Sequence, residues 1–183
     1  MDFQKARKLF EEHVRSEKVR LHCREVEAVM RGLAKELGED EEKWAMAGLL
    51  HDMDCDIEPD IRNQARKAVE ILKEKTDCPG EVCHAILSHN EANLGIKRES
   101  KLDYALSAAD NISGMIYAYA LMRGTIGGME PKGVKKKLKD KGFAATVRRE
   151  LIYDIEKAGM ELSAFLDVSI RAMQGIKREI GLR

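Results

Sequence analysis

Four polar residues stand inside otherwise apolar, helix-type patterns, and their types suit a metal ion. His51 and Asp52 end the apolar run AMAGLL, and His22 lies on the apolar stripe of an earlier helical pattern. Asp110 lies within LDYALSAADNISGMIYAYALM, the least polar stretch of the chain. A carboxylate buried there needs a cation or several hydrogen-bond donors. Imidazole and carboxylate groups together suit a divalent transition metal, so the pattern predicts a metal site in a helical-bundle core.

His89 is a further candidate, and an alternative stays open for Asp110. His89 shares an apolar stripe with Val82 and Ile86, so we expect it to point inward as well. Asp110 could instead form a salt bridge with an arginine from another helix. The two remaining histidines, His13 and His84, are expected at the surface.

Helices must position these residues, because apolar side chains recur at helical spacing and the chain has only three prolines. Gly38 is a stop signal, and the acidic run at 39–42 favours a helix start. Small residues around Gly48 would let a neighbouring helix approach closely. Helices are expected over about 2–16, 20–37, from 39–42 to His51, 61–75, through 82–89, 101–122, 143–157 and 161–180. We therefore predict a single all-α domain over residues 1–183.

Composition excludes several classes of protein. Thirty-two basic residues balance 32 acidic ones among 183 residues, so no global attraction to nucleic acid or membrane is indicated. No apolar stretch is long enough for a transmembrane helix, and the N-terminus has no apolar signal-peptide core. The four cysteines form no CxxC pair. They are expected to be reduced thiols in a cytoplasmic protein.

The combined motifs resemble a known family. A histidine about 30 residues before AGLLHD, then AILSHNE, then SAADNISG is similar to the HD superfamily of metal-dependent phosphohydrolases. The resemblance covers roughly residues 1–175 and extends to a subfamily described only as predicted HD-superfamily hydrolases. Members share LGEDEEKWAMAGLLHDMD, the HNE and AAD segments, and a basic stretch like GVKKKLKDKGFAATVRRE.

The resemblance implies an HD-type helical bundle and a set of ligands. His22, His51, Asp52 and Asp110 would bind one divalent transition metal: iron, manganese, cobalt, nickel or zinc. The metal-binding core would span about 18–122, with a helical extension over about 132–183. His89 matches an extra ligand of two-metal relatives, but the chain has Asn63 or Gln64 where many relatives have another histidine. Amides bind transition metals poorly, so we favour one metal, with a second metal through His89 as the alternative.

The expected reaction is hydrolysis of a phosphate ester in a small phosphorylated metabolite or nucleotide. Asp54, which matches the family's HDxD pattern, is the predicted proton acceptor, and His89 could protonate the leaving oxygen. The alternative for Asp54 and Asp56 is that they cap the next helix or face solvent. A non-catalytic domain that binds a nucleotide or holds a structural metal is the alternative function.

The segment from Lys132 to Arg149 is rich in lysine and arginine. It could supply positive charge to a phosphorylated substrate, or it could be a solvated face that balances acidic segments elsewhere. Phe143 is its only aromatic residue, which argues against stacking of single-stranded nucleic acid. Nucleic acid and membrane partners are therefore not expected. The Met- and Tyr-rich side of the 101–122 helix could be core or a homodimer contact.

Overall fold

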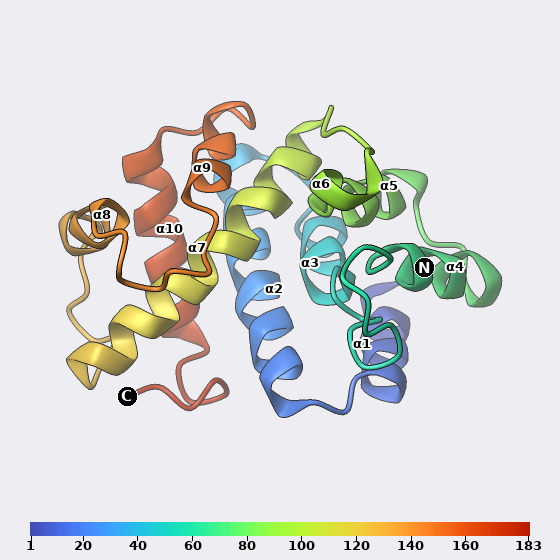
Figure 1. Ribbon diagram of the computed structural model, residues 1–183, viewed down its shortest axis with the longest axis horizontal. Coiled ribbons are helices and arrows are strands. Elements are labelled where there is room, and N and C mark those ends of the chain that lie inside the picture. Colours follow the sequence, from blue (N-terminus) through green and yellow to red (C-terminus); the bar gives the residue numbers. More distant parts are fainter.

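The computed structural model describes all 183 residues, which form helices and turns without any strand (Figure 1). The prediction of a single all-α domain is confirmed. None of the helices combines the length and apolar character that crossing a bilayer would need. In chain order the elements are α1 (Phe3–His13), α2 (Glu17–Leu37), α3 (Glu41–Leu50), α4 (Arg66–Lys75), α5 (Gly80–His89), α6 (Glu91–Leu94), α7 (Lys101–Arg123), α8 (Pro131–Lys139), α9 (Arg149–Ile152), the 3₁₀ helix η1 (Tyr153–Glu156) and α10 (Leu162–Gly175).

Local sequence signals set the ends of the helices that matter for the site. α2 ends at Gly38, whose φ of 70° is the left-handed conformation that glycine adopts without strain. The Asp40 side chain accepts a hydrogen bond from the Lys43 backbone and caps α3. Ser100 and Asp103 form a reciprocal capping box at the start of α7. The predicted stop at Gly38 and the start in the acidic run are both confirmed.

The long helices α2 and α7 lie at the centre of the molecule, with α1, α4 and α5 on one side and α8 and α10 on the other (Figure 1). One continuous cluster of 51 buried apolar residues holds them together. α3 lies so close to α2 that a Cβ added at Gly48 would be 2.9 Å from backbone atoms of Val26 and Glu27. Glycine therefore sets the distance between the two helices, as predicted, and places the end of α3 beside α2.

The predicted helix over 61–75 begins only at Arg66, because residues 51–65 form a series of turns. The Asn90 side chain donates hydrogen bonds to the carbonyls of Ile61 and Gln64, and Ala65 adopts a φ of 73°. These carbonyls accept hydrogen bonds from a side chain instead of from backbone N–H groups one turn later, so the helix does not start earlier. The loop instead passes over the end of α5.

The C-terminal helices are also shorter than predicted. The expected helix over 143–157 is reduced to α9 and η1, and α10 ends at Gly175 rather than near 180. The Arg149 guanidinium donates to carbonyls of residues 138–147, including Leu138 and Val147, which keeps this stretch in turns. The lysine-rich segment itself forms α8, with Pro131 in its first turn.

The Met- and Tyr-rich side of α7 packs in the core for part of its length, and the homodimer contact stays a prediction. Met115 is buried in the core, and the Tyr119 ring packs edge-on against Phe143 with 6.3 Å between ring centres. Leu121 and Met122, near the end of the helix, are exposed.

Candidate metal centre

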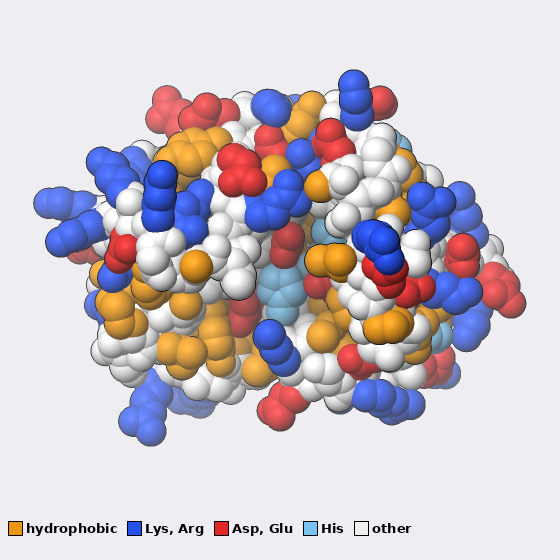
Figure 2. Space-filling view, in the orientation of Figure 1, with side chains coloured by type: hydrophobic (Ala, Val, Ile, Leu, Met, Phe, Trp, Pro, Cys, Tyr) orange, Lys and Arg blue, Asp and Glu red, His pale blue; other side chains and the backbone are white.

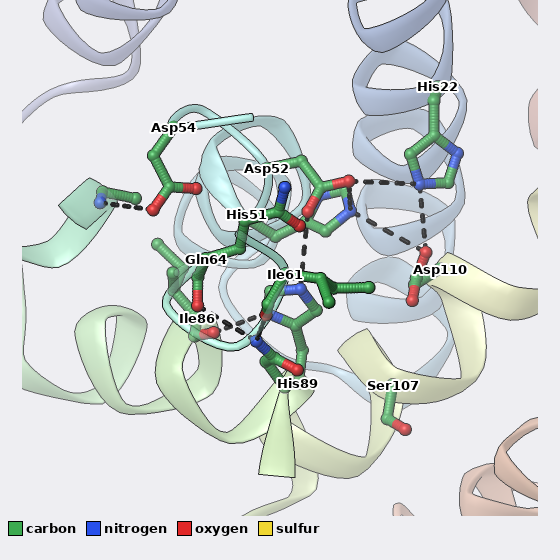
Figure 3. A network of polar contacts seen from close by, with 12 residues as sticks. His22, His51, Asp52, Asp54, Ile61, Gln64, Ile86, His89, Ser107 and Asp110 are labelled. Atoms are coloured by element: carbon green, nitrogen blue, oxygen red, sulfur yellow. Dashed lines mark hydrogen bonds and ion pairs between the residues drawn. The ribbon is translucent and has the colours of Figure 1, made fainter. Parts of the chain in front are cut away.

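The structure brings the four expected ligand residues together from three helices. His22 extends from α2, His51 and Asp52 follow α3, and Asp110 extends from α7 (Figure 3). The ligand atoms of His22, His51 and Asp52 all lie within 4.8 Å of one another. Asp110 Oδ1 is 3.0 Å from His22 Nε2 and 3.8 Å from His51 Nε2. Residues separated by 88 positions in the chain thus converge on one point.

Backbone hydrogen bonds orient the His51 ring for a ligand. His51 Nδ1 donates to the Gly48 carbonyl over 2.8 Å, and that carbonyl can only accept, so the proton is fixed on Nδ1. In the neutral ring Nε2 then carries the lone pair, and this atom is buried without a hydrogen-bond partner. An unsatisfied buried nitrogen is costly unless something binds it. A metal ion is the partner that this arrangement suits.

The separations between donor atoms equal or slightly exceed those around one ion. Bonds of about 2.1 Å to a central metal put neighbouring ligand atoms roughly 3.0–3.4 Å apart. Asp52 Oδ2 lies 3.4 Å from His51 Nε2 and 3.9 Å from His22 Nε2. Two carboxylates and two imidazoles form a mixed oxygen and nitrogen set that divalent transition metals bind well. The cluster could therefore hold a metal.

The charges within the cluster are strongly coupled. Burial alone would raise the pKa of Asp52, but the charge of His51 outweighs burial and holds this pKa well below its usual range. Burial likewise opposes ionisation of Asp110, and the hydrogen bond from His22 lowers its pKa overall. Burial lowers the pKa of His51, but the Asp52 carboxylate outweighs burial and raises it well above the usual value. Metal binding would therefore displace a proton from His51.

His89, the last residue of α5, lies against the other side of Asp52. Its Nε2 is 3.5 Å from Asp52 Oδ1, and its Nδ1 contacts the carbonyl of Ile86. The His89 and His51 rings meet edge to face with 5.1 Å between their centres. His89 therefore adjoins the four-residue cluster rather than forming part of its centre.

A cavity of about 310 Å³ opens onto this cluster. Figure 2 shows a hollow near the middle of the visible face, with histidine and acidic side chains at its floor. Arg148 is the only lysine or arginine among the lining residues, and Asn111 accepts a hydrogen bond from its backbone N–H over 3.1 Å. The lining residues are His22, Asp52, Ile61, Gln64, His89, Asn90, Asp110, Asn111, Thr146, Val147 and Arg148.

The two amides considered as replacements for a further histidine ligand are placed differently. Gln64 lines the cavity, and its side chain donates to the Glu58 carbonyl over 3.1 Å. Asn63 is exposed and does not line the cavity. The cavity therefore has the Gln64 amide where many relatives have a histidine, and this favours a single metal.

Asp54, the predicted proton acceptor, does not line the cavity. Its side chain is fully buried, and Oδ2 accepts a hydrogen bond from the Ala68 backbone in the first turn of α4 (Figure 3). Burial raises the pKa of this carboxyl. Asp56 accepts hydrogen bonds from the backbones of Arg15 and Ser16. The capping interpretation of Asp54 thus describes the structure better than the catalytic one.

Two other histidines and the basic segment lie outside the site. His84 is not free, because its Nδ1 lies 3.0 Å from Asp103 Oδ2. His13 contacts the Leu9 carbonyl on α1. Lys and Arg side chains gather at the left of Figure 2, where α8 lies, and none of the α8 lysines lines the cavity. Of the lysines and arginines in the basic segment, only Arg148 lines the cavity.

Two residues of interest were not singled out by the sequence. Arg148 was one of many cations in a basic segment, and nothing local distinguishes it. Glu25 lies three residues after His22 and is buried, with a pKa raised to about 8 by that burial. Its position on the apolar stripe with Val26 and Val29 was the available signal.

Comparison with known proteins agrees with this geometry. The HD domain family model matches residues 19–115, a range that contains the four clustered residues and His89 but not Arg148. Ribonuclease Y of Oleidesulfovibrio alaskensis is 32% identical over 99 residues, which are 54% of this chain and 18% of that protein. The chain thus matches less than a fifth of this relative's length. No solved structure is significantly similar to the chain.

Proposed function

The chain belongs to the HD domain family, and from that premise we propose that it is a metal-dependent phosphohydrolase of a small phosphorylated metabolite or nucleotide. One observation supports this most: the unpartnered Nε2 of buried His51 faces a second histidine and two carboxylates. The cluster opens into a cavity whose lining includes a single arginine. A cation site beside a positive side chain suits an anionic substrate.

In this proposal His22, His51, Asp52 and Asp110 hold one divalent transition metal, drawn from iron, manganese, cobalt, nickel and zinc. When bound, such an ion polarises the phosphoryl oxygen and activates water at neutral pH. The amide of Gln64 favours a single ion, and a second ion held through His89 is the alternative.

His89 takes the proton-transfer role. Among the titratable side chains that line the cavity, only His89 and Arg148 are outside the set of four ligands, and arginine keeps its proton. His89 Nδ1 is engaged by the Ile86 carbonyl, so Nε2 is the atom that exchanges a proton with the substrate. We assign it the protonation of the leaving oxygen.

Arg148 binds the phosphoryl group. Its backbone is anchored to α7 through Asn111, the residue after Asp110, so the arginine and the ligand cluster share one support. Its side chain has only a weak contact of 3.5 Å with Glu150 and is half exposed. A guanidinium matches a phosphate through two parallel hydrogen bonds.

The experiment compares two aspartates that are two residues apart: Asp52 in the cluster and the buried Asp54 outside the cavity. Phosphate release from a panel of phosphate esters is measured with each of the five metals, for the wild type, Asp52→Asn and Asp54→Asn. We expect Asp52→Asn to lose metal and activity, whereas Asp54→Asn unfolds more easily but keeps both. Undiminished turnover in Asp52→Asn contradicts the proposal. Nucleotide binding without any turnover favours a non-catalytic domain instead.

A further inference from the structure

A second hollow, of about 380 Å³, shares His22 with the metal cavity. It lies along one side of α2 and is bounded by α7, and the residues that line it are Glu17, Lys18, Leu21, His22, Glu25 and Tyr117. His22 is the only residue that lines both hollows. We call this second hollow the Glu25 groove.

The Glu25 carboxyl has no partner in the protein. The residue is 3% exposed, no hydrogen bond or ion pair of the protein reaches its side chain, and its carboxyl oxygens keep slight access to solvent. Lys18 lines the same groove without pairing with it. Buried carboxyls are almost always hydrogen-bonded or paired, because their desolvation is otherwise uncompensated. An unpartnered carboxyl at the wall of a hollow is therefore a vacant position for a ligand's hydrogen-bond donor.

The surroundings of Glu25 narrow the class of ligand. The carbonyl oxygen of the Glu25 carboxyl accepts a hydrogen bond in either protonation state, so a ligand that presents a donor such as N–H matches it. Glu17 and Lys18 on the same wall carry opposite charges, so together they favour neither a cationic nor an anionic ligand. Leu21 and the Tyr117 ring supply apolar surface on which an uncharged ring can pack.

We propose that the Glu25 groove is the leaving-group subsite, which binds an uncharged, N–H-bearing ring of the substrate through the Glu25 carboxyl. This inference rests on the proposed function, because it takes the phosphoryl group to lie at the metal cluster. Because both hollows border His22, a molecule that extends across this side chain would occupy both. Glu25 touches the substrate away from the bond that breaks, so it determines specificity rather than chemistry.

The test separates binding of the ring from hydrolysis. Nucleosides serve as probes, because their bases are uncharged rings with N–H donors and they carry no phosphate. Binding of the four common ribonucleosides to the metal-free protein is measured by calorimetry for the wild type, Glu25→Leu and Glu25→Gln. We expect at least one nucleoside to bind, about fivefold or more weakly to Glu25→Leu, with Glu25→Gln retaining most of the affinity.

Protein stability distinguishes a lost contact from a damaged fold. Glu25→Leu removes a buried unpartnered carboxyl, so this variant should unfold at a higher temperature while it binds less well. A variant that loses both affinity and stability, or a groove that binds nucleosides equally well in all three proteins, overturns the proposal. So does the absence of nucleoside binding to the wild type.

Hydrolysis supplies a second, independent readout. Ribose 5-phosphate has the phosphate ester and the sugar of a nucleoside 5′-monophosphate but no base. We expect Glu25→Leu to raise KM for the nucleotide and to leave ribose 5-phosphate hydrolysis unchanged; equal effects on both overturn the subsite. If neither ester is hydrolysed with any metal, the proposed function fails. The nucleoside titration alone then decides whether the Glu25 groove binds an uncharged ring.

Discussion

The metal cluster and the Glu25 groove share His22, yet the pKa values of their carboxyls shift in opposite directions. Asp52 and Asp110 face histidines, whose charges and hydrogen bonds overcome burial and lower both pKa values. Glu25 lies one turn from His22 on α2 but has no partner, and burial raises its pKa to about 8. Burial is common to both regions, so neighbouring groups decide which carboxyl is ionised.

The largest expected effect comes from breaking the cluster at its buried centre. His51→Ala removes the nitrogen that has no protein partner, and we expect metal affinity to fall by at least about 100-fold. Metal competition with a chelating dye measures this change. His84→Ala is the matched control, because His84 pairs with Asp103 away from the cluster. Equal metal affinity in both variants would remove His51 from the site.

Replacing the ionisable group of Glu25 tests the other side of the comparison. The folded protein holds this proton up to about pH 8, whereas the unfolded chain releases it near its ordinary value of 4.5. The folded state therefore binds more protons over this interval, and its stability falls as pH rises from 4.5 to 8.

Glu25→Gln cannot lose a proton, so it should escape this part of the pH dependence. Relative to the wild type, we expect the variant to gain on the order of 3 kcal/mol between pH 4.5 and pH 8, measured by urea unfolding. A difference between the two proteins that does not change with pH would show that Glu25 is ionised in the folded state.

Changing the helix spacing should affect the cluster and spare the groove. Gly48→Ala places a Cβ 2.9 Å from the α2 backbone, so α3 must shift, at a cost of about 2 kcal/mol in the free energy of unfolding. His51 follows α3, so metal affinity should fall as well. Gly175→Ala is the control, since nothing lies within 4 Å of the added Cβ. Metal titration and thermal unfolding of both variants check this prediction.

The smallest effect is expected at the wall of the metal cavity. Arg148→Ala removes the only arginine there and should raise KM for a phosphate ester about tenfold, with little change in metal content. Lys141→Ala, from the same basic segment but outside the cavity, should leave KM unchanged. Equal effects of the two substitutions would assign the contribution to the general charge of the segment.

The sequence could predict residues whose position follows from a local helical pattern, but not residues whose position depends on contacts between distant segments. A histidine or aspartate inside an apolar helical stripe must face the core, which is why His22, His51 and Asp110 could be named in advance. Asp54 follows Asp52 by two residues, but turns reverse the chain there and direct its carboxyl to the start of α4. Arg148 was hidden because its role depends on a loop held by Asn111, a contact between distant segments.

The most direct test of the central claim is the metal content of the protein purified without chelator, measured by mass spectrometry beside Asp52→Asn. About one divalent transition metal per chain, lost in the variant, is the result that we predict for a site of two histidines and two aspartates. A wild-type protein that takes up no metal even after reconstitution, or a variant that keeps its full complement, would contradict the account.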